Sequence, residues 1–140
     1  MTMSGRKSFT GLSCAQDAAK QAYEMAGVGP QDVDVAEVHD CFTISELLAY
    51  EDLGFAKPGE GIRLVEDKQT YVDGKIPVNV DGGLLSKGHP IGATGGSQIR
   101  TIVRQLRGES SEAQVKDAEI GLVHNIGGVG QYGNVVVLRR

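Results

Sequence analysis

The sequence predicts a layered α/β domain. Helical periodicity over residues 10–26, 41–53 and 91–106 alternates with a short β-branched run at 33–38, and two further apolar runs lie near the C-terminus. Helices interleaved with strands in this order are typical of a sheet covered by helices. The 140 residues suffice for one domain with a moderate core.

The first predicted helix, residues 10–26, carries a stripe of small side chains. We expect Thr10 or Ser13 to cap its start and Gly27 to end it. Small side chains permit a close approach to a neighbouring element. The stripe consists of Ala15, Ala18, Ala19, Ala22 and Ala26.

The second and third predicted helices are amphipathic. In residues 41–53, Thr43 and Glu46 have the spacing of a capping box, and Gly54 is placed to stop the helix. In residues 91–106, apolar residues recur at i, i+3, i+4 and i+7. These are Ile99, Ile102, Val103 and Leu106.

The sequence predicts only three strands, which is few for a domain with three helices. Beside 33–38, the runs 118–125 and 134–140 are expected to form a hairpin through a glycine-rich join. Residues 55–78 read as a long polar loop, a length that is usually functional or mobile. With no strand before the first helix, three strands would cover that helix poorly, so we expect the chain to be part of a larger fold.

Composition excludes several classes of function. The formal net charge of -4 argues against nucleic acid as the main partner. No apolar run approaches the roughly 20 residues that span a bilayer, and the N-terminus lacks the apolar region of a signal peptide. Two cysteines in such a chain favour reduced thiols and a cytoplasmic location.

Three polar clusters stand at predicted strand or helix ends. "EVHDCFT" contains His39 and Cys41, "KGHPIGATGG" contains His89, and "VHNIGGVGQYG" contains His124 and Asn125. In open α/β folds, ligands bind at such ends. The three clusters are therefore candidates for one site.

Each cluster also has a purely structural interpretation. Cys41 can be a small buried apolar residue, Asp40 can cap a helix, and His89 can belong to a tight turn. His124 and Asn125 can satisfy backbone groups at a strand end. Three histidines and a cysteine could bind zinc, but no C-x-x-C or i, i+3 spacing supports it, and we expect no metal.

Taken together, the clusters favour thioester or enolate chemistry. A cysteine and a histidine supply a thiolate and its partner base. Glycine N–H groups and an imidazole at a helix N-terminus are what an oxyanion site requires. The residues alone carry the interpretation no further.

The motifs resemble the C-terminal half of the thiolase superfamily. "GGLLSKGHPIGATGGSQI" looks like the thiolase histidine motif, and "AEVHDCFT" resembles the second motif of sterol-carrier-protein-type thiolases. "HNIGGVGQYG" resembles the terminal loop, with Asn125 where typical thiolases have a cysteine. The resemblance covers nearly the whole chain and implies a thiolase-like C-terminal domain over residues 1–140, with a layered mixed sheet whose first strand is missing.

The resemblance also implies roles for individual residues. His89 would activate a nucleophilic cysteine and help form an oxyanion hole, and His39 would hold a water or contribute to a second oxyanion hole. Cys41 would move the proton at the α-carbon, since the carboxamide of Asn125 does not titrate near neutral pH. Asn125, Gly127 and Gly128 would bind the thioester, the glycines through backbone N–H groups.

In this superfamily the acyl-accepting cysteine belongs to the N-terminal half, and Cys14 matches no nucleophile motif. We therefore expect a fragment or separately encoded half, inactive alone, with an N-terminal half as partner in a homo- or hetero-oligomer. Coenzyme A thioesters would be substrates, with no further cofactor. Some relatives are aldolases on steroid side-chain CoA esters or act with a zinc-ribbon/OB-fold protein. A non-catalytic scaffold domain remains the third alternative.

Overall fold

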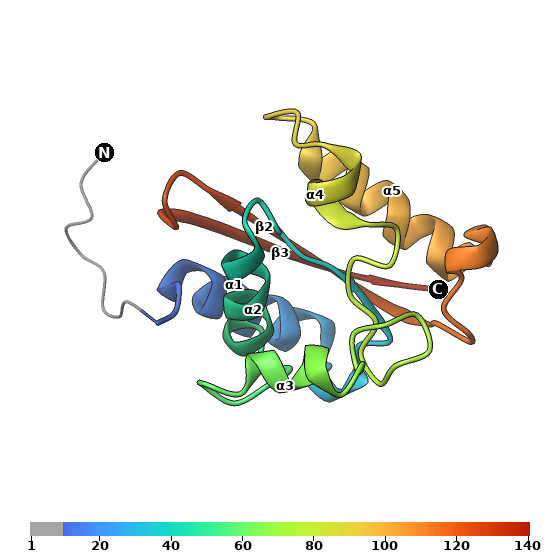
Figure 1. The fold of residues 1–140 in the computed structure, drawn as a ribbon, viewed down its shortest axis with the longest axis horizontal. Helices are drawn as coiled ribbons and strands as arrows, with labels where there is room; N and C mark the ends of the chain where they lie inside the picture. Colours follow the sequence, from blue (N-terminus) through green and yellow to red (C-terminus); the bar gives the residue numbers. More distant parts are fainter. Residues whose placement is uncertain (1–9) are drawn as a thin grey trace.

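The structure is a computed structural model that describes residues 10–140 (Figure 1). The longer helices are α1 (Ser13–Ala26), α2 (Thr43–Asp52) and α5 (Thr94–Arg107), and the shorter ones are α3 (Gly61–Glu66) and α4 (Gly83–Lys87). The strands are β1 (Val35–Glu37), β2 (Ile120–Gly127) and β3 (Tyr132–Arg139). Two 3-10 turns, Pro30–Asp32 and Ser111–Ala113, complete the order.

The three strands form one mixed sheet in the order β1-β2-β3. β1 pairs with β2 in parallel, and β2 pairs with β3 as an antiparallel hairpin. Beyond β1, an isolated parallel bridge joins Ala36 to Val78. The sequence predicted these three strands, although the hairpin strands lie about two residues from the expected bounds.

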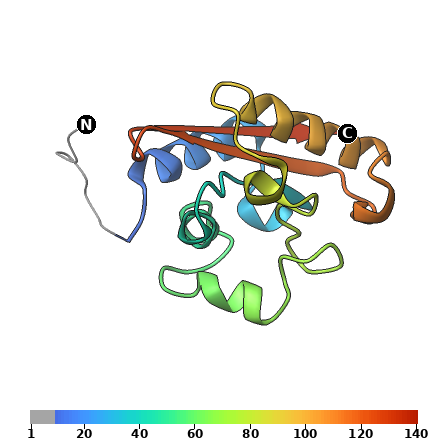
Figure 2. The ribbon, with the colours of Figure 1, turned by 45° about the horizontal axis from the view of Figure 1, so that its top comes forward.

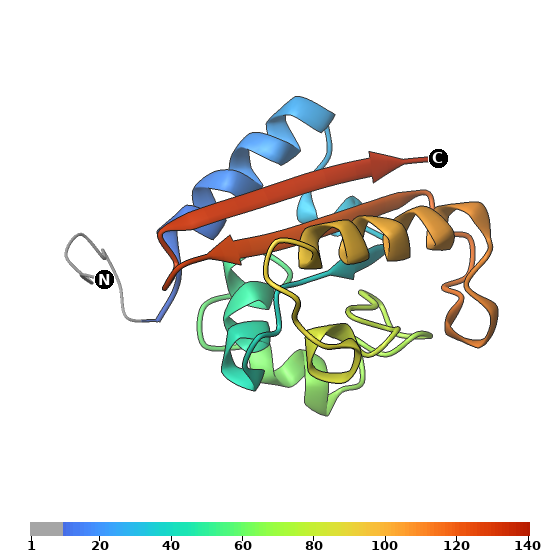
Figure 3. The same cartoon turned by 90° about the horizontal axis from the view of Figure 1, so that it is seen from above.

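Helices cover both faces of the sheet, which gives the predicted layered architecture (Figures 2 and 3). One core combines Ala19 of α1 and Tyr50 of α2 with Leu122 of β2. The other places Ile102 of α5 against Val35 and Val123. Alternation along β2 explains this division, because successive side chains of a strand point to opposite faces.

α1 packs unusually close to β3, as its alanines predict. Ala15 and Ala19 are buried. A Cβ placed on Gly133 of β3 would lie 2.4 Å from the carbonyl oxygen of Cys14, so only a glycine fits there. The first part of the stripe is therefore buried at the sheet, whereas Ala26 at its end is exposed.

The predicted N-caps of α1 and α2 are wrong. Leu12, and neither Thr10 nor Ser13, occupies the N-cap of α1, and its N–H donates to Asp52 Oδ2 at 2.8 Å. At α2 the N-cap is Phe42, without a side-chain cap hydrogen bond. Glu46 instead accepts from Asn79 Nδ2 at 3.0 Å. Long-range partners replace the local ones at both places.

The predicted helix ends are confirmed. Gly27 has φ 67° at the C-cap of α1. Gly54 follows the end of α2 with φ 80° and donates its N–H to the carbonyl of Glu51. Glycine adopts positive φ without steric cost, which is why it ends helices.

The segments around the third predicted helix differ from expectation. α5 begins at Thr94, three residues after the predicted start, because residues 90–93 form a turn in which Pro90 O accepts from the N–H of Ala93 and of Thr94. The expected long loop contains α3, and α4 lies in a stretch for which no helix was predicted.

The close approach at Gly133 leads to a stability prediction. Gly133→Ala should lower the free energy of unfolding by about 1–3 kcal/mol, because its Cβ would overlap the backbone of α1. Gly96→Ala, in α5 where an added Cβ meets open space, should be neutral or stabilising by up to about 1 kcal/mol. Urea unfolding of both variants measures the difference, and equal effects would contradict the packing argument.

Candidate functional site

The site lies where β1 and β2 end side by side. Because the two strands run parallel, with Glu37 opposite Val123, the segments that follow them leave the sheet at the same edge. β1 leads into His39 and Cys41, and β2 continues through Asn125. Residues far apart in the sequence thus meet at one edge.

His39 and His89 are in direct contact. Their ring centroids lie 4.8 Å apart with an interplanar angle of 85°, an edge-on arrangement. His39 is buried, whereas His89 is exposed on the turn before α5. Burial and the neighbouring His89 lower the pKa of His39, against an opposing effect of Asp40, so His39 is neutral at pH 7.

Thr94 orients the ring of His89. His89 Nδ1 lies 2.7 Å from Thr94 Oγ1, and that hydroxyl also donates to Pro90 O at 3.3 Å. A hydroxyl carries a single proton, so when Thr94 donates to Pro90 it accepts from His89 Nδ1–H. In that tautomer His89 Nε2 carries no proton and can act as a base.

Cys41 stands at the entrance to α2. Its Sγ lies 3.7 Å from Ser45 Oγ, and the side chain is partly buried. A partly exposed thiol beside two imidazoles can exchange protons with a bound substrate.

Asn125 is held from the α5 side of the sheet. Its Nδ2 donates to Gln98 Oε1 at 2.9 Å, and Gln98 Nε2 donates to the carbonyl of His124 at 3.1 Å. Gln98 is fully buried. Both contacts fix the orientation of the Asn125 amide.

These side chains line a single cleft of about 710 Å³, a volume suited to a small-molecule site. Its polar lining comprises His39, Cys41, His89, Thr94, Asn125 and Asn134, and its glycines include Gly127 and Gly128. A groove of about 750 Å³ along α1 has no histidine or cysteine among its described lining residues. Of these two hollows, only the first cleft therefore combines imidazole and thiol groups.

The structure brings together all six residues predicted for the site: His39, Cys41, His89, Asn125, Gly127 and Gly128. Their roles stay predictions. Asp40 does serve as a cap, but at α4, where it accepts the N–H of Leu84 at 2.7 Å. Cys14 lies on α1, where its carbonyl faces β3. Gln98 and Thr94 escaped the sequence analysis, although Thr94 stands five residues after His89 at a helix start.

His124 is buried beside this site. It is 1% exposed, and within residues 10–140 neither ring nitrogen has a hydrogen-bond partner. Burial and the nearby His39 lower the pKa of His124 to about 4.

Residues 10–140 contain neither a cluster of metal ligands nor a membrane-spanning helix. No three His, Cys, Asp or Glu side chains gather there in a metal-binding arrangement. No helix in the same range has the length and apolar character needed to cross a membrane.

The lowered pKa of His124 predicts a pH-dependent stability. The pKa of His124 is about 6.5 in the unfolded chain and about 4 in the fold, so the unfolded chain binds the proton more tightly. The free energy of unfolding therefore decreases as the pH falls from about 6.5 toward 4. Between pH 7 and pH 5, wild type should lose about 2 kcal/mol more unfolding free energy than His124→Phe. Urea unfolding at both pH values measures this, and parallel losses would refute the assignment.

Curated relatives match the chain over most of its length. It is 50% identical over 135 residues to an acetyl-CoA acetyltransferase of Methanothermobacter thermautotrophicus, which covers 96% of this chain and 35% of that protein. It is 48% identical over 119 residues to sterol carrier protein 2 of Rattus norvegicus, covering 85% of this chain and 22% of the relative. The chain thus spans about a third or less of these proteins.

A solved structure and a family model agree with this. The structure titled "Ltp2-ChsH2(DUF35) aldolase" superposes with a TM-score of 0.85 at 28% identity, covering 97% of this chain and 34% of the other. The model described as "Thiolase C-terminal domain-like" matches residues 1–140. This chain therefore belongs to the thiolase C-terminal domain family.

Proposed function

We propose that this chain is the acid/base and oxyanion part of a thiolase-type acyl-CoA C-acyltransferase. The observation that carries the proposal is the convergence of His39, Cys41 and His89 on one cleft. The relatives named as acetyl-CoA acetyltransferase and benzoylsuccinyl-CoA thiolase subunit support the class of reaction. Thiolysis and Claisen condensation use the same site in opposite directions.

Each side chain then has a step that suits its chemistry. In thiolysis, His89 Nε2 accepts the thiol proton of a nucleophilic cysteine, and the thiolate attacks the β-keto carbonyl of the substrate. The bond between the α- and β-carbons breaks, which gives an acyl-cysteine and the enolate of the shortened CoA thioester, and Cys41 donates a proton to the α-carbon of that enolate. The thiol of free coenzyme A then takes the acyl group from the cysteine, and condensation runs these steps in reverse. The neutral ring of His39 carries one N–H that can donate to the developing oxyanion. Asn125 and the N–H groups of Gly127 and Gly128 hold the thioester.

The nucleophilic cysteine is proposed to come from a partner half. Cys41, already assigned to the α-carbon, is the one cysteine among the described residues that line the cleft. Apolar side chains at the cleft are uncovered: Phe42 is 69% exposed and Ile91 is 93% exposed. Exposed apolar groups beside a polar site mark a surface that another protein segment covers.

Retro-aldol cleavage is the second candidate, because the superposed structure is titled an aldolase. Such a reaction needs a base and an oxyanion site but no acyl-cysteine. The sterol carrier protein 2 relatives leave both reactions open. A non-catalytic scaffold would have no use for the grouped histidines and thiol.

Reconstitution tests the acyltransferase proposal. The chain is mixed with an N-terminal thiolase half that carries the nucleophile, and acetoacetyl-CoA cleavage is followed. His89→Ala and Cys41→Ser should each lower the rate by about 10²–10⁴-fold, since each removes a proton-transfer group. Cys14→Ser, on α1, is the matched control and should leave the rate unchanged. An unaltered rate in His89→Ala would refute the assignment.

Dependence on free coenzyme A separates the two reactions. With a β-ketoacyl-CoA substrate, thiolysis should stop when free coenzyme A is omitted, because it is the acyl acceptor. Retro-aldol release from a β-hydroxyacyl-CoA needs no acceptor. Carbonyl product formed without added coenzyme A, measured by mass spectrometry, would favour the aldolase alternative.

A further inference from the structure

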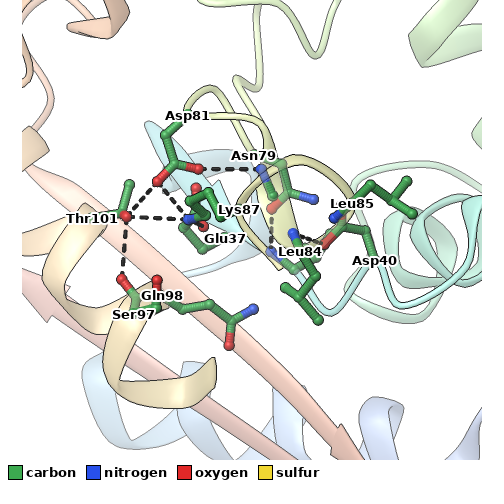
Figure 4. Close-up of polar contacts among 12 residues, drawn as sticks. Glu37, Asp40, Asn79, Asp81, Leu84, Leu85, Lys87, Ser97, Gln98 and Thr101 are labelled. Carbon is green, nitrogen blue, oxygen red and sulfur yellow. Dashed lines mark hydrogen bonds and ion pairs between the residues drawn. The ribbon is translucent and has the colours of Figure 1, made fainter. Parts of the chain in front are cut away.

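The two histidine rings of the cleft come from different elements, and a polar network joins those elements just before each ring (Figure 4). Lys87 Nζ donates to Glu37 Oε2 at 3.1 Å. Glu37 lies two residues before His39, and Lys87 lies two residues before His89. This hydrogen bond therefore connects the backbone segments that carry the two rings.

A second connection runs through Asp40, the residue after His39. Asp40 Oδ1 accepts the N–H of Leu84 at 2.7 Å, and Oδ2 accepts the N–H of Leu85 at 3.3 Å. Both donors belong to α4, which leads directly to the turn that carries His89. Contacts on either side of His39 thus hold the same short helix.

α5 is attached to the same network. Thr101 Oγ1 donates to Asp81 Oδ2 at 2.6 Å, and Asp81 pairs with Lys87. Thr94, which orients His89, lies two turns earlier on α5. The network therefore joins β1, α4 and α5; β1 and α4 lead into His39 and His89, and α5 lines the cleft itself.

Stability alone does not account for this contact. Glu37 is fully buried, and burial together with Asp81 raises its pKa to about 8 against the effect of Lys87, so the carboxyl is largely protonated at pH 7. Its Oε1 has no hydrogen-bond partner among the described residues. Buried polar pairs often contribute no more to stability than apolar residues of similar volume would, and in some proteins their role is to fix one geometry.

We propose that Glu37, Lys87 and Asp40 are positioning residues that set the spacing and edge-on orientation of the His39 and His89 rings. Their importance for catalysis rests on the proposed function. The spacing and orientation of the rings depend only on contacts within this chain, so they can be measured without turnover.

The test uses the double variant Glu37→Gln/Lys87→Met in the full chain. Nuclear Overhauser effects between the two rings should be lost. The titration midpoint of His39 should shift upward, because the contact with His89 helps to lower its pKa. The single variant Lys87→Arg keeps a cation beside the native Glu37. It should keep both the Overhauser effects between the rings and the His39 midpoint near their wild-type values. Lys20→Met/Glu24→Gln, which removes an exposed pair on α1, is the matched control and should change neither.

Circular dichroism checks that each variant folds. If the double variant does not fold, the same two NMR measurements are made on Glu37→Gln, which preserves the side-chain shape. A folded variant that keeps the ring contact and the wild-type His39 midpoint overturns the inference. Failure of the reconstituted enzyme to cleave acetoacetyl-CoA would instead contradict the proposed function and leave these NMR results valid.

Discussion

The site depends on the parallel pairing of β1 with β2. Only this register delivers residues 39–41 and 124–128 to the same edge of the sheet, although some 85 residues separate them in the chain. A parallel pair needs a crossover connection, and here it includes α2, α4 and α5. Within this connection, the turn that carries His89 and the first residues of α5 line the cleft as well. The connection that makes the sheet possible therefore also contributes to the site.

Local sequence signals predicted the elements well but their starts poorly. Gly27 and Gly54 end helices for a reason contained in one residue, the freedom to adopt positive φ. The start of α1 depends on Asp52, 40 residues away, which accepts the N–H of Leu12. The periodicity of α1 gives no information about such a partner. The contact of Asp52 with Leu12 fixes the start of α1 from a distance, and no local cap forms there.

For the site, the sequence supplied the residues and the fold supplied their geometry. The resemblance to thiolases selected His39, Cys41 and His89, and all three line one cleft. The tautomer of His89 was unpredictable because it depends on Thr94 and the carbonyl of Pro90. The pair of Glu37 with Lys87 was equally invisible, since no spacing rule links residues 50 positions apart.

At the start of α4, the residues that can occupy position 83 depend on the residue at position 40. Gly83 has φ 58°, and a Cβ there would fall 2.2 Å from Asp40 Oδ2. A side chain at 83 and a carboxylate at 40 therefore compete for the same space. The effects of substitutions at the two positions are non-additive, because losing either one already removes the hydrogen bond to Leu84. A residue with a side chain at position 83 therefore requires a different residue or conformation at position 40.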